Sequence, residues 1–195
     1  MNNTIKTDRR IIKTKKAIRN AFAELLSEKD ISEITVKDIA DAAEINRKTF
    51  YSYYAGVYEV VDAIENEIVS AFNEALRDVD FKRDLNNPYG IFKKLTAIIN
   101  SDMNFYGHLM KMNHNTNLIS KIIQTLKLSI KKSFSEQVAI DEKTLNLVVD
   151  YAVAGMVTVY QSWFNSDRTQ SIEEISKTIS VITFSGINGL LAGKN

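Results

Sequence analysis

Residues 34–54 read ITVKDIADAAEINRKTFYSYY and contain the starts of two short helices. Thr35 is a good N-cap for the first helix, and Asp38 stands at the third helical position, as in a capping box. Asn46 is placed to cap a second helix only three residues after Ala43. The stretch therefore predicts two short helices joined by a tight turn.

The side chains of these two helices divide into a buried face and an exposed face. Helical spacing places four residues of the first helix on its buried side: Val36, Ile39, Ala40 and Ala43. In the second helix, Phe50 and Tyr54 share the buried side. The opposite side of the second helix carries Arg47, Lys48, Tyr51 and Ser52. We therefore expect the second helix to present a basic and hydroxyl-rich surface.

Apolar residues at helical spacing also predict a longer first helix over residues 8–28. Two short helices packed on a first helix form a helix-turn-helix, whose second short helix enters the major groove of DNA. The alternative is an ordinary helical hairpin with a solvated Arg–Lys pair. Four aromatic residues on a short basic helix weigh against that alternative, because exposed tyrosines cost solubility unless they bind a partner.

The residue types on the second short helix suit DNA. Arg47 and Lys48 can donate to guanine O6 and N7, and Ser52 can bond several bases. Tyr51 and Tyr53 are long hydroxyl donors that suit phosphates. The pattern thus favours base contacts from the first turn and backbone contacts from the tyrosines.

Two features outside this helix also favour a polyanion. Thr35 would offer a hydroxyl group and free backbone N–H groups to a phosphate. Residues 1–19 hold seven basic residues and one acidic residue, whereas the whole chain carries a net charge of only +1. Lys13 and Lys16 belong to this basic segment, which indicates a nucleic-acid partner for the N-terminus unless it is merely a solvated helix face.

The blocks 34–43 and 45–54 resemble the DNA-binding domain of the tetracycline-repressor (TetR) family. The family pattern reads roughly T-V-x-x-I-A-x-x-A-G-V-S-x-x-T-F-Y-x-Y-F, and spacing and residue types agree over the whole stretch. The resemblance implies a DNA-binding domain over residues 8–72, with the helix-turn-helix at about 35–54, and a helical regulatory and dimerisation domain over residues 73–195.

The resemblance implies a homodimeric transcription factor, usually a repressor, that a small ligand releases from a palindromic operator. It puts these residues at DNA-contacting positions: Thr35, Arg47, Lys48, Thr49, Tyr51, Ser52 and Tyr53. Two positions depart from the family pattern. Glu44 replaces the turn glycine, so a residue with a Cβ must accept that geometry, and Val57 replaces a lysine that usually contacts a phosphate. We expect the basic N-terminal segment to supply the missing contact.

The composition excludes several classes of protein. There is no cysteine, which excludes disulfides, thiolate-ligated metals and thiol catalysis. The two histidines, His108 and His114, are six residues apart rather than four, and no glycine-rich phosphate loop occurs. We therefore predict no catalytic residues, no metal site, no cofactor and no enzymatic activity. One proline and seven glycines favour an all-α fold, with about nine helices.

The last two expected helices, residues 142–165 and 171–192, are apolar on more than one face. Such helices must be buried on several sides. A dimeric four-helix bundle, with two helices from each subunit, would bury them, and burial in the monomer's own core is the alternative. The residues expected at the dimer contact are Gly155, Val159, Gly186 and Gly189.

A segment rich in methionine and aromatic residues predicts a ligand pocket, because methionine adapts to varied apolar groups. The predicted lining residues are Met103, Phe105, His108, Met112 and Tyr160. The alternative is that these side chains are ordinary core. Because no Arg or Lys lies between Lys94 and Lys111, we expect a neutral or cationic, partly aromatic ligand.

The N-terminus has no apolar signal region, and no stretch reaches the length of a membrane span. We therefore expect a soluble, cytoplasmic protein without a membrane partner. The expected partners are a double-stranded DNA operator, a second copy of the chain and an unknown small-molecule effector. The competing interpretation is a helical co-regulator or activator, whose C-terminal domain binds a protein partner through an exposed apolar patch.

Overall fold

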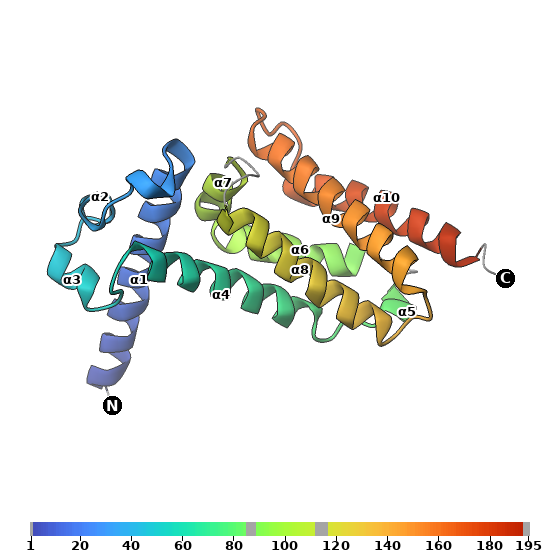
Figure 1. Cartoon of the computed structure of the whole chain (residues 1–195), viewed down its shortest axis with the longest axis horizontal. Helices are drawn as coiled ribbons and strands as arrows, with labels where there is room; N and C mark the ends of the chain where they lie inside the picture. The colour runs from blue at the N-terminus through green and yellow to red at the C-terminus, as the bar shows by residue number, and fades with distance from the viewer. Residues whose placement is uncertain (1, 85–88, 112–116, 193–195) are drawn as a thin grey trace. The chain divides into compact units, whose positions relative to one another are not determined.

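The computed structural model describes residues 2–84, 89–111 and 117–192, and these residues form an all-α fold without strands (Figure 1). Nine helices have five or more residues: α1 (Asn2–Glu28), α2 (Val36–Ala42), α3 (Arg47–Tyr51), α4 (Val57–Leu76), α6 (Tyr89–Ser101), α7 (Met103–Lys111), α8 (Asn117–Ser135), α9 (Glu142–Phe164) and α10 (Ile172–Ala192). A single turn, α5 (Phe81–Asp84), and a 3-10 turn, η1 (Ile31–Glu33), complete the described elements. The predicted fold class is confirmed.

The chain divides into two compact units. The first unit contains residues 1–67 and 104–113, and the second contains residues 68–103 and 114–195. The segment 104–113 falls in the second domain expected from the sequence, but in the structure it belongs to the first unit. The chain therefore passes between the units three times, at residues 67/68, 103/104 and 113/114.

The core of the first unit is built from the buried faces of its first three helices. Ile18 and Phe22 of α1 are fully buried, as are Ile39 of α2 and Phe50 of α3. α1 packs on α2, and α2 packs on α3. The apolar periodicity therefore produces the expected three-helix arrangement.

The segment 104–113 joins the first unit through Arg19 of α1. The Arg19 guanidinium lies 4.0 Å from the centre of the Phe105 ring and forms an ion pair with Glu67 of α4. Near the end of the same helix, Ser27 Oγ lies 3.4 Å from Nδ1 of His108. Within the first unit, α7 thus contacts α1 through both ring stacking and polar groups.

The second unit is a bundle in which α10 packs on α6 and α9, and α8 packs on α9 (Figure 1). Three buried hydroxyl groups from three different helices meet in its core. Ser176 Oγ lies 2.5 Å from Oγ1 of Thr96 and 2.8 Å from the Tyr160 hydroxyl. Because each hydroxyl has a partner, the bundle buries them without an unsatisfied polar atom.

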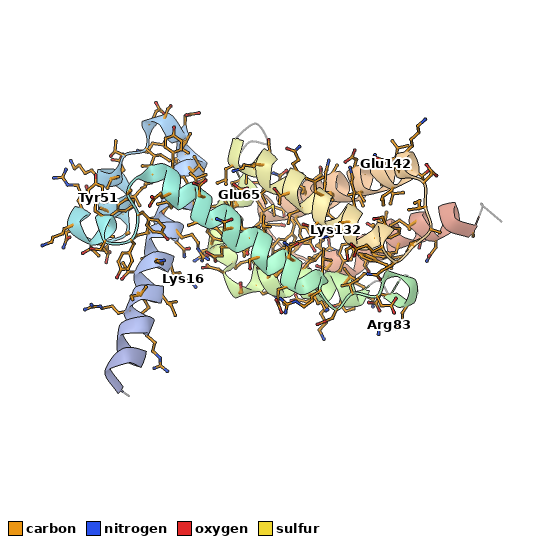
Figure 2. All side chains as sticks on the ribbon, turned by 60° about the horizontal axis from the view of Figure 1, so that its bottom comes forward. Lys16, Tyr51, Glu65, Arg83, Lys132 and Glu142 are labelled. Atoms are coloured by element: carbon orange, nitrogen blue, oxygen red, sulfur yellow. The ribbon has the colours of Figure 1, made fainter. Side chains whose placement is uncertain are left out.

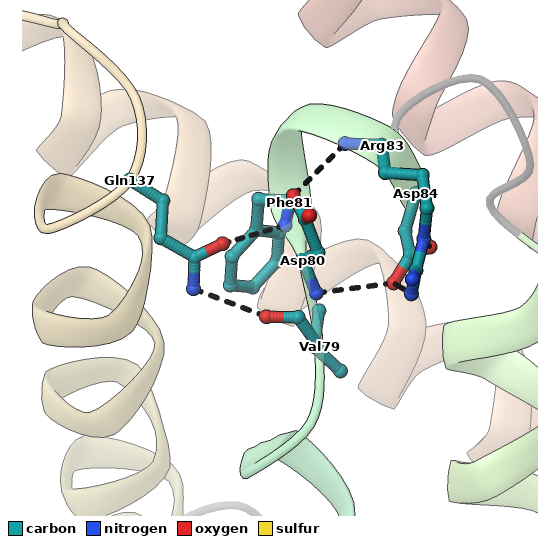
Figure 3. Close-up of polar contacts among 6 residues, drawn as sticks. All are labelled: Val79, Asp80, Phe81, Arg83, Asp84 and Gln137. Atoms are coloured by element: carbon teal, nitrogen blue, oxygen red, sulfur yellow. Dashed lines mark hydrogen bonds and ion pairs between the residues drawn. The ribbon is translucent and has the colours of Figure 1, made fainter.

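Gln137, just beyond α8, holds the connection between α4 and α5 (Figure 3). Its Oε1 accepts from the backbone N–H of Phe81 at 2.8 Å, and its Nε2 donates to the Val79 carbonyl at 3.0 Å. The Phe81 ring packs against Phe134 of α8, with 5.0 Å between ring centres. One amide side chain therefore satisfies two backbone groups of this connection and fixes Phe81 against the bundle.

Helix boundaries differ from the predicted ones mainly at two places. α1 begins at Asn2 rather than near residue 8, because the basic N-terminal segment contains no proline or glycine that would stop a helix. α3 ends at Tyr51 rather than near Tyr54, and the chain continues in turns that still bury Tyr54. The last two helices, α9 and α10, start and end within one residue of the predicted ranges 142–165 and 171–192.

Candidate nucleic-acid interface

Side-chain caps fix the starts of α2 and α3. At α2, Thr35 Oγ1 accepts from the Asp38 N–H at 3.2 Å, and Asp38 Oδ2 accepts from the Thr35 N–H at 2.9 Å. At α3, Asn46 Oδ1 accepts from the Thr49 N–H at 2.7 Å. Both predicted caps are present, so the short helices begin where the sequence pattern places them.

The cap at α2 gives the polar groups of Thr35 a partner within the protein. The backbone N–H of Thr35 is not free, because Asp38 accepts from it. The Thr35 hydroxyl also donates to Asp38 Oδ2, at 2.8 Å. These hydrogen bonds lower the pKa of Asp38, so its carboxylate stays charged beside the helix start. Thr35 remains exposed, and its hydroxyl and N–H groups both have Asp38 as a partner.

Glu44 occupies the turn between α2 and α3 with a positive φ of 54°. This left-handed conformation is the one that glycine adopts without cost, and it is uncommon for other residues. After the turn, the Ile45 N–H donates to the Ala40 carbonyl at 2.9 Å, which closes the end of α2. The residue that departs from the family pattern therefore keeps the expected turn geometry, at the cost of backbone strain.

The predicted DNA-contacting side chains lie on one short segment, and five of the seven are exposed: Thr35, Arg47, Lys48, Tyr51 and Ser52. Phe50 anchors this segment, because its buried ring packs edge-on against Tyr51 and tilted against Tyr54. Figure 2 labels Tyr51 on α3. The fold therefore presents the basic face of α3 to solvent.

The other two predicted residues, Thr49 and Tyr53, are half-buried. The Thr49 hydroxyl donates to the capping Asn46 at 3.1 Å, so it contributes to the cap as well as to the surface. The hydroxyl of Ser52 donates to the Lys48 carbonyl at 3.0 Å, which leaves its lone pairs to accept from a base amino group or water.

α1 carries a second basic surface in the same unit. Five basic residues of this helix are exposed: Arg9, Arg10, Lys13, Lys15 and Lys16. Lys16 is labelled in Figure 2. Lys15 lies near the turn that follows α3, with its Nζ 5.9 Å from the centre of the Tyr54 ring. The basic charge of the N-terminus is thus organised along one helix.

Two side chains that suit phosphates are not among the residues predicted from the sequence. Tyr58 lies in the first turn of α4, next to the substituted Val57, and is 70% exposed. Lys37 is exposed in the first turn of α2. An exposed aromatic residue beside the missing lysine was a usable signal, because a tyrosine hydroxyl can replace an ammonium group as a phosphate donor.

The residues predicted to bind a ligand are divided between the two units. Phe105 and His108 belong to the first unit, whereas Met103 and Tyr160 belong to the second. Phe105 is fully buried under Arg19, and the Tyr160 hydroxyl contacts Ser176. Met112 lies outside the described residues. The second unit does contain an apolar cavity, but its lining includes none of the four described residues.

The residues predicted at a dimer contact are all exposed in the single chain. A Cβ placed on Gly155, Gly186 or Gly189 would meet no atom within 4 Å. Large apolar side chains are exposed on the same two helices: Leu147, Tyr151 and Val159 of α9, and Val181 and Ile182 of α10. We call this surface the α9/α10 face.

Two features are absent from the residues that the structure describes. These residues contain no group of three or more His, Asp or Glu side chains that could hold a metal ion. None of their helices has both the length and the apolar character that a membrane span requires.

Family comparisons match both parts of the chain. Residues 18–64 match a family model described as "Bacterial regulatory proteins, tetR family", and residues 86–185 match one described as "Transcriptional regulator C-terminal region". The chain is 40% identical over 58 residues to an uncharacterized HTH-type transcriptional regulator, YxbF, of Bacillus subtilis, covering 29% of this chain and 15% of that protein. It is 36% identical over 62 residues to the dhaKLM operon transcriptional activator DhaS of Lactococcus lactis, covering 31% of this chain and 33% of that protein. The chain thus spans at most a third of the length of these two curated relatives.

Solved structures share the fold over nearly the whole chain. A structure of the dihydroxyacetone kinase operon activator DhaS has a TM-score of 0.54 and 20% identity, and the match covers 90% of this chain and 96% of that one. NalD, the secondary repressor of the MexAB-OprM multidrug efflux pump in Pseudomonas aeruginosa, has a TM-score of 0.60 and 17% identity, covering 89% and 96%. Because the two family models cover both ends of a chain that folds into this all-α architecture, the chain belongs to the TetR family of DNA-binding transcriptional regulators.

Proposed function

We propose that this regulator is a homodimeric repressor, which binds a palindromic operator through α3 and leaves it when a small molecule binds the second unit. The observation that carries the DNA-binding part is the exposed face of α3. On this face Arg47, Lys48 and Tyr51 are exposed to solvent, while Phe50 on the opposite side anchors the helix in the core. A helix held in this way can enter a major groove without unfolding its support.

Different residue types suit contacts with the DNA bases and contacts with the DNA backbone. Arg47 and Lys48 stand in the first turn of α3 and can donate to guanine in the major groove. Tyr51, Tyr53 and Tyr58 carry hydroxyl groups that suit phosphates. The exposed lysines and arginines of α1 add affinity that does not depend on sequence, because they release counterions from the DNA.

A second copy of the chain is the proposed occupant of the α9/α10 face. Tyr151 is 72% exposed and Ile182 is 61% exposed, which is unusual for large apolar side chains on two long helices. Gly155 and Gly189 leave open space beside them, so a helix of a second copy can approach closely. Two-fold pairing through this face would form a four-helix bundle and present two copies of α3 to a palindrome.

The repressor role is supported by the structural likeness to NalD, which is described as a repressor. DhaS is described as an activator, so both signs of regulation occur on related folds. The second unit contains a cavity, which favours a small-molecule effector over a protein partner for this unit. In this proposal the protein works in the cytoplasm as a binding protein without catalytic activity.

Selection of bound fragments from a random DNA pool would test this proposal. We expect a palindromic consensus, and we expect the Arg47→Ala variant to lose preference for it while keeping its fold by circular dichroism. A reporter gene placed under the selected operator then gives the sign, because a repressor lowers its expression and an activator raises it. A pool that yields no consensus, with a correctly folded dimer, would overturn the proposal.

A further inference from the structure

α8 and α9 form an open groove at the surface of the second unit, with a volume of about 470 Å³. The two helices pack on each other (Figure 1). Asp150 of α9 lines the groove, and the other lining residues all come from α8. We call this site the α8/α9 groove. It shares no lining residue with the apolar cavity of the second unit.

Polar residues form a row along the α8 side of the groove. They are three or four positions apart, which places them on one face of the helix: Ser120, Gln124, Lys127 and Lys131. At a rise of about 1.5 Å per residue, the row is about 16 Å long. Helical spacing places Ile123 on one side of this row and Leu128 on the other. The groove therefore offers charged and hydrogen-bonding groups in a line, with apolar surface beside them.

Two lysines of this row converge on one carboxylate. The Nζ atoms of Lys127 and Lys131 lie 3.0 Å and 3.9 Å from Oδ1 of Asp150. The two lysine side chains are only 26% and 24% exposed, so their aliphatic stems are packed and their ammonium groups are held at the groove. The hydrogen bond from Lys127 and the charges of both lysines lower the pKa of Asp150, which keeps the carboxylate ionised. The three charged groups together carry a net charge of +1.

A structural ion pair at this position would need only one lysine. Like charges four positions apart on a helix repel each other, and an ion pair near the surface contributes little stability. The rest of α8 adds to the excess charge, because the helix contains four lysines and neither Asp nor Glu: Lys121, Lys127, Lys131 and Lys132. Asp150 is also the only acidic residue that lines the groove. The groove therefore has positive charge to offer to an anion.

The volume and the charged groups of the groove suit a small phosphate ester. Clefts of about 300–1,000 Å³ are typical of small-molecule sites. Two separate ammonium groups suit a phosphate monoester, which presents three acceptor oxygens and a charge of about −1.5 to −2 at pH 7. Lysine binds such a group as a point charge, whereas a flat carboxylate is matched best by the fork of an arginine, and no arginine lines the groove. Leu128, which is 61% exposed, can contact an apolar part of the ligand.

We propose that the α8/α9 groove binds a small organic phosphate. Its phosphate group contacts Lys127 and Lys131, and its apolar part lies on Ile123 and Leu128. This ligand differs in charge from the neutral or cationic effector expected from the sequence, and it binds at the surface. The site requires neither operator binding nor repression, so it goes beyond the proposed function.

Phenyl phosphate, phenol and inorganic phosphate are suitable probes for the full-length protein. In an NMR spectrum with labelled isoleucine and leucine methyl groups, phenyl phosphate should shift the signals of Ile123 and Leu128. Phenol has the ring without the charge and should leave both signals unchanged. Inorganic phosphate should bind more weakly than phenyl phosphate, because it lacks the apolar part. Ile12, which is 65% exposed on the basic helix α1, is the internal control and should show no saturable shift.

A neighbouring lysine provides the matched control. Lys131→Met removes a charge from the groove and keeps an unbranched side chain, and Lys132→Met makes the same change on α8 at a residue that does not line the groove (Figure 2). We expect Lys131→Met to weaken phenyl phosphate binding roughly fivefold and Lys132→Met to leave it within about twofold. If Lys131→Met does not fold by circular dichroism, Lys127→Met removes the other ammonium group and should weaken binding in the same direction.

Asp150→Asn tests the proposal with the opposite sign. The change removes the carboxylate that competes for both ammonium groups, so phenyl phosphate binding should strengthen roughly threefold. A purely structural ion pair predicts no such gain. Weaker binding in Asp150→Asn, or equal binding by Lys131→Met and Lys132→Met, would overturn the inference. Equal shifts with phenol and phenyl phosphate would also overturn it, and equal affinity for the two phosphates would overturn the role of Ile123 and Leu128.

Two further measurements test other occupants of the groove. Operator affinity without any probe should be the same in Lys131→Met and the parent, and a loss would assign the groove to the DNA backbone instead. Light scattering should also give the same mass for both proteins, and a change to monomer would assign the groove to a second copy of the chain. A protein that binds phenyl phosphate in the groove but no operator contradicts only the proposed function.

Discussion

Arg19 and Phe105, which are 86 positions apart in the chain, stack with 4.0 Å between the guanidinium carbon and the ring centre. Arg19 is only 9% exposed, and its second partner, Glu67, is half-exposed. This stacking joins α7 to the helix that carries the basic N-terminal surface. The contact therefore holds residues 104–113, which lie between the two stretches of the second unit in the sequence, within the DNA-binding unit.

Replacement of Arg19 by alanine should destabilise the first unit. The variant loses a cation–π contact, the packing of the long side chain and the ion pair with Glu67, for a cost of about 1–3 kcal/mol. Urea unfolding followed by circular dichroism would measure the difference. Arg10→Ala, an exposed change on the same helix, should shift stability by less than about 0.5 kcal/mol. Equal stability of the two variants would show that the stacking contributes nothing.

Arg47→Ala should weaken binding to the selected operator by about 1–3 kcal/mol and relax base preference, because a bidentate contact is lost. Lys13→Ala should instead weaken binding to all sequences and reduce the slope of affinity against salt. Fluorescence anisotropy at several salt concentrations separates the two effects. Full operator affinity in Arg47→Ala would contradict the assignment of α3 as the recognition helix.

Glu44→Gly should stabilise the protein by up to about 1 kcal/mol, because glycine adopts the positive φ of this turn without strain. The gain is limited because glycine also makes the unfolded chain more flexible. The same change removes a negative charge near the proposed DNA surface, so affinity should rise. Glu44→Ala is the matched control: it removes the charge but keeps a Cβ, so it should raise affinity without raising the unfolding temperature.

Gly155→Glu and Gly189→Glu should each convert the proposed dimer to monomer. Both glycines lie on the α9/α10 face, and a buried glutamate there would have no partner in the contact. Light scattering at micromolar concentration measures the change, and Ala97→Glu on α6 serves as an exposed control that keeps the dimer. If all three variants stay dimeric, another surface must join the subunits.

Stability should fall as the solution is acidified below about pH 4, near the ordinary pKa of an aspartate. Hydrogen bonds from Thr35 hold the pKa of Asp38 below its usual range in the folded protein. A carboxylate with a depressed folded pKa contributes stability above its unfolded pKa and loses it as the pH falls through its folded pKa. The Asp38→Asn variant should therefore show a flatter fall in unfolding temperature than the parent. If the unfolding temperatures of the two proteins fall in parallel with pH, Asp38 does not contribute to the acid sensitivity.

The helix-turn-helix was predictable because its determinants are local. Thr35 and Asp38 are three residues apart, as are Asn46 and Thr49, so their hydrogen bonds follow from helical spacing alone. The position of Glu44 in a left-handed turn followed from the family pattern for the same reason. Local hydrogen bonds need no knowledge of how distant segments pack.

The candidate ligand site was not predictable in this way. Phe105 matched a pocket residue by type, but long-range contact with Arg19 makes it part of the first unit. Tyr160 has the residue type of a polar pocket group, and in the structure its hydroxyl contacts Ser176 on another helix. The cavity combines side chains from six helices, and spacing along one helix carries no information about which faces meet.

The three passages of the chain between its two units bear on how the protein can be dissected. A single proteolytic cut near residue 67 would divide the first unit, because residues 104–113 remain attached to the second unit at both ends. A fragment ending at residue 67 would lack Phe105 and expose the buried guanidinium of Arg19. The DNA-binding unit therefore consists of two separate stretches of the amino-acid sequence. No truncation at a single position isolates it intact.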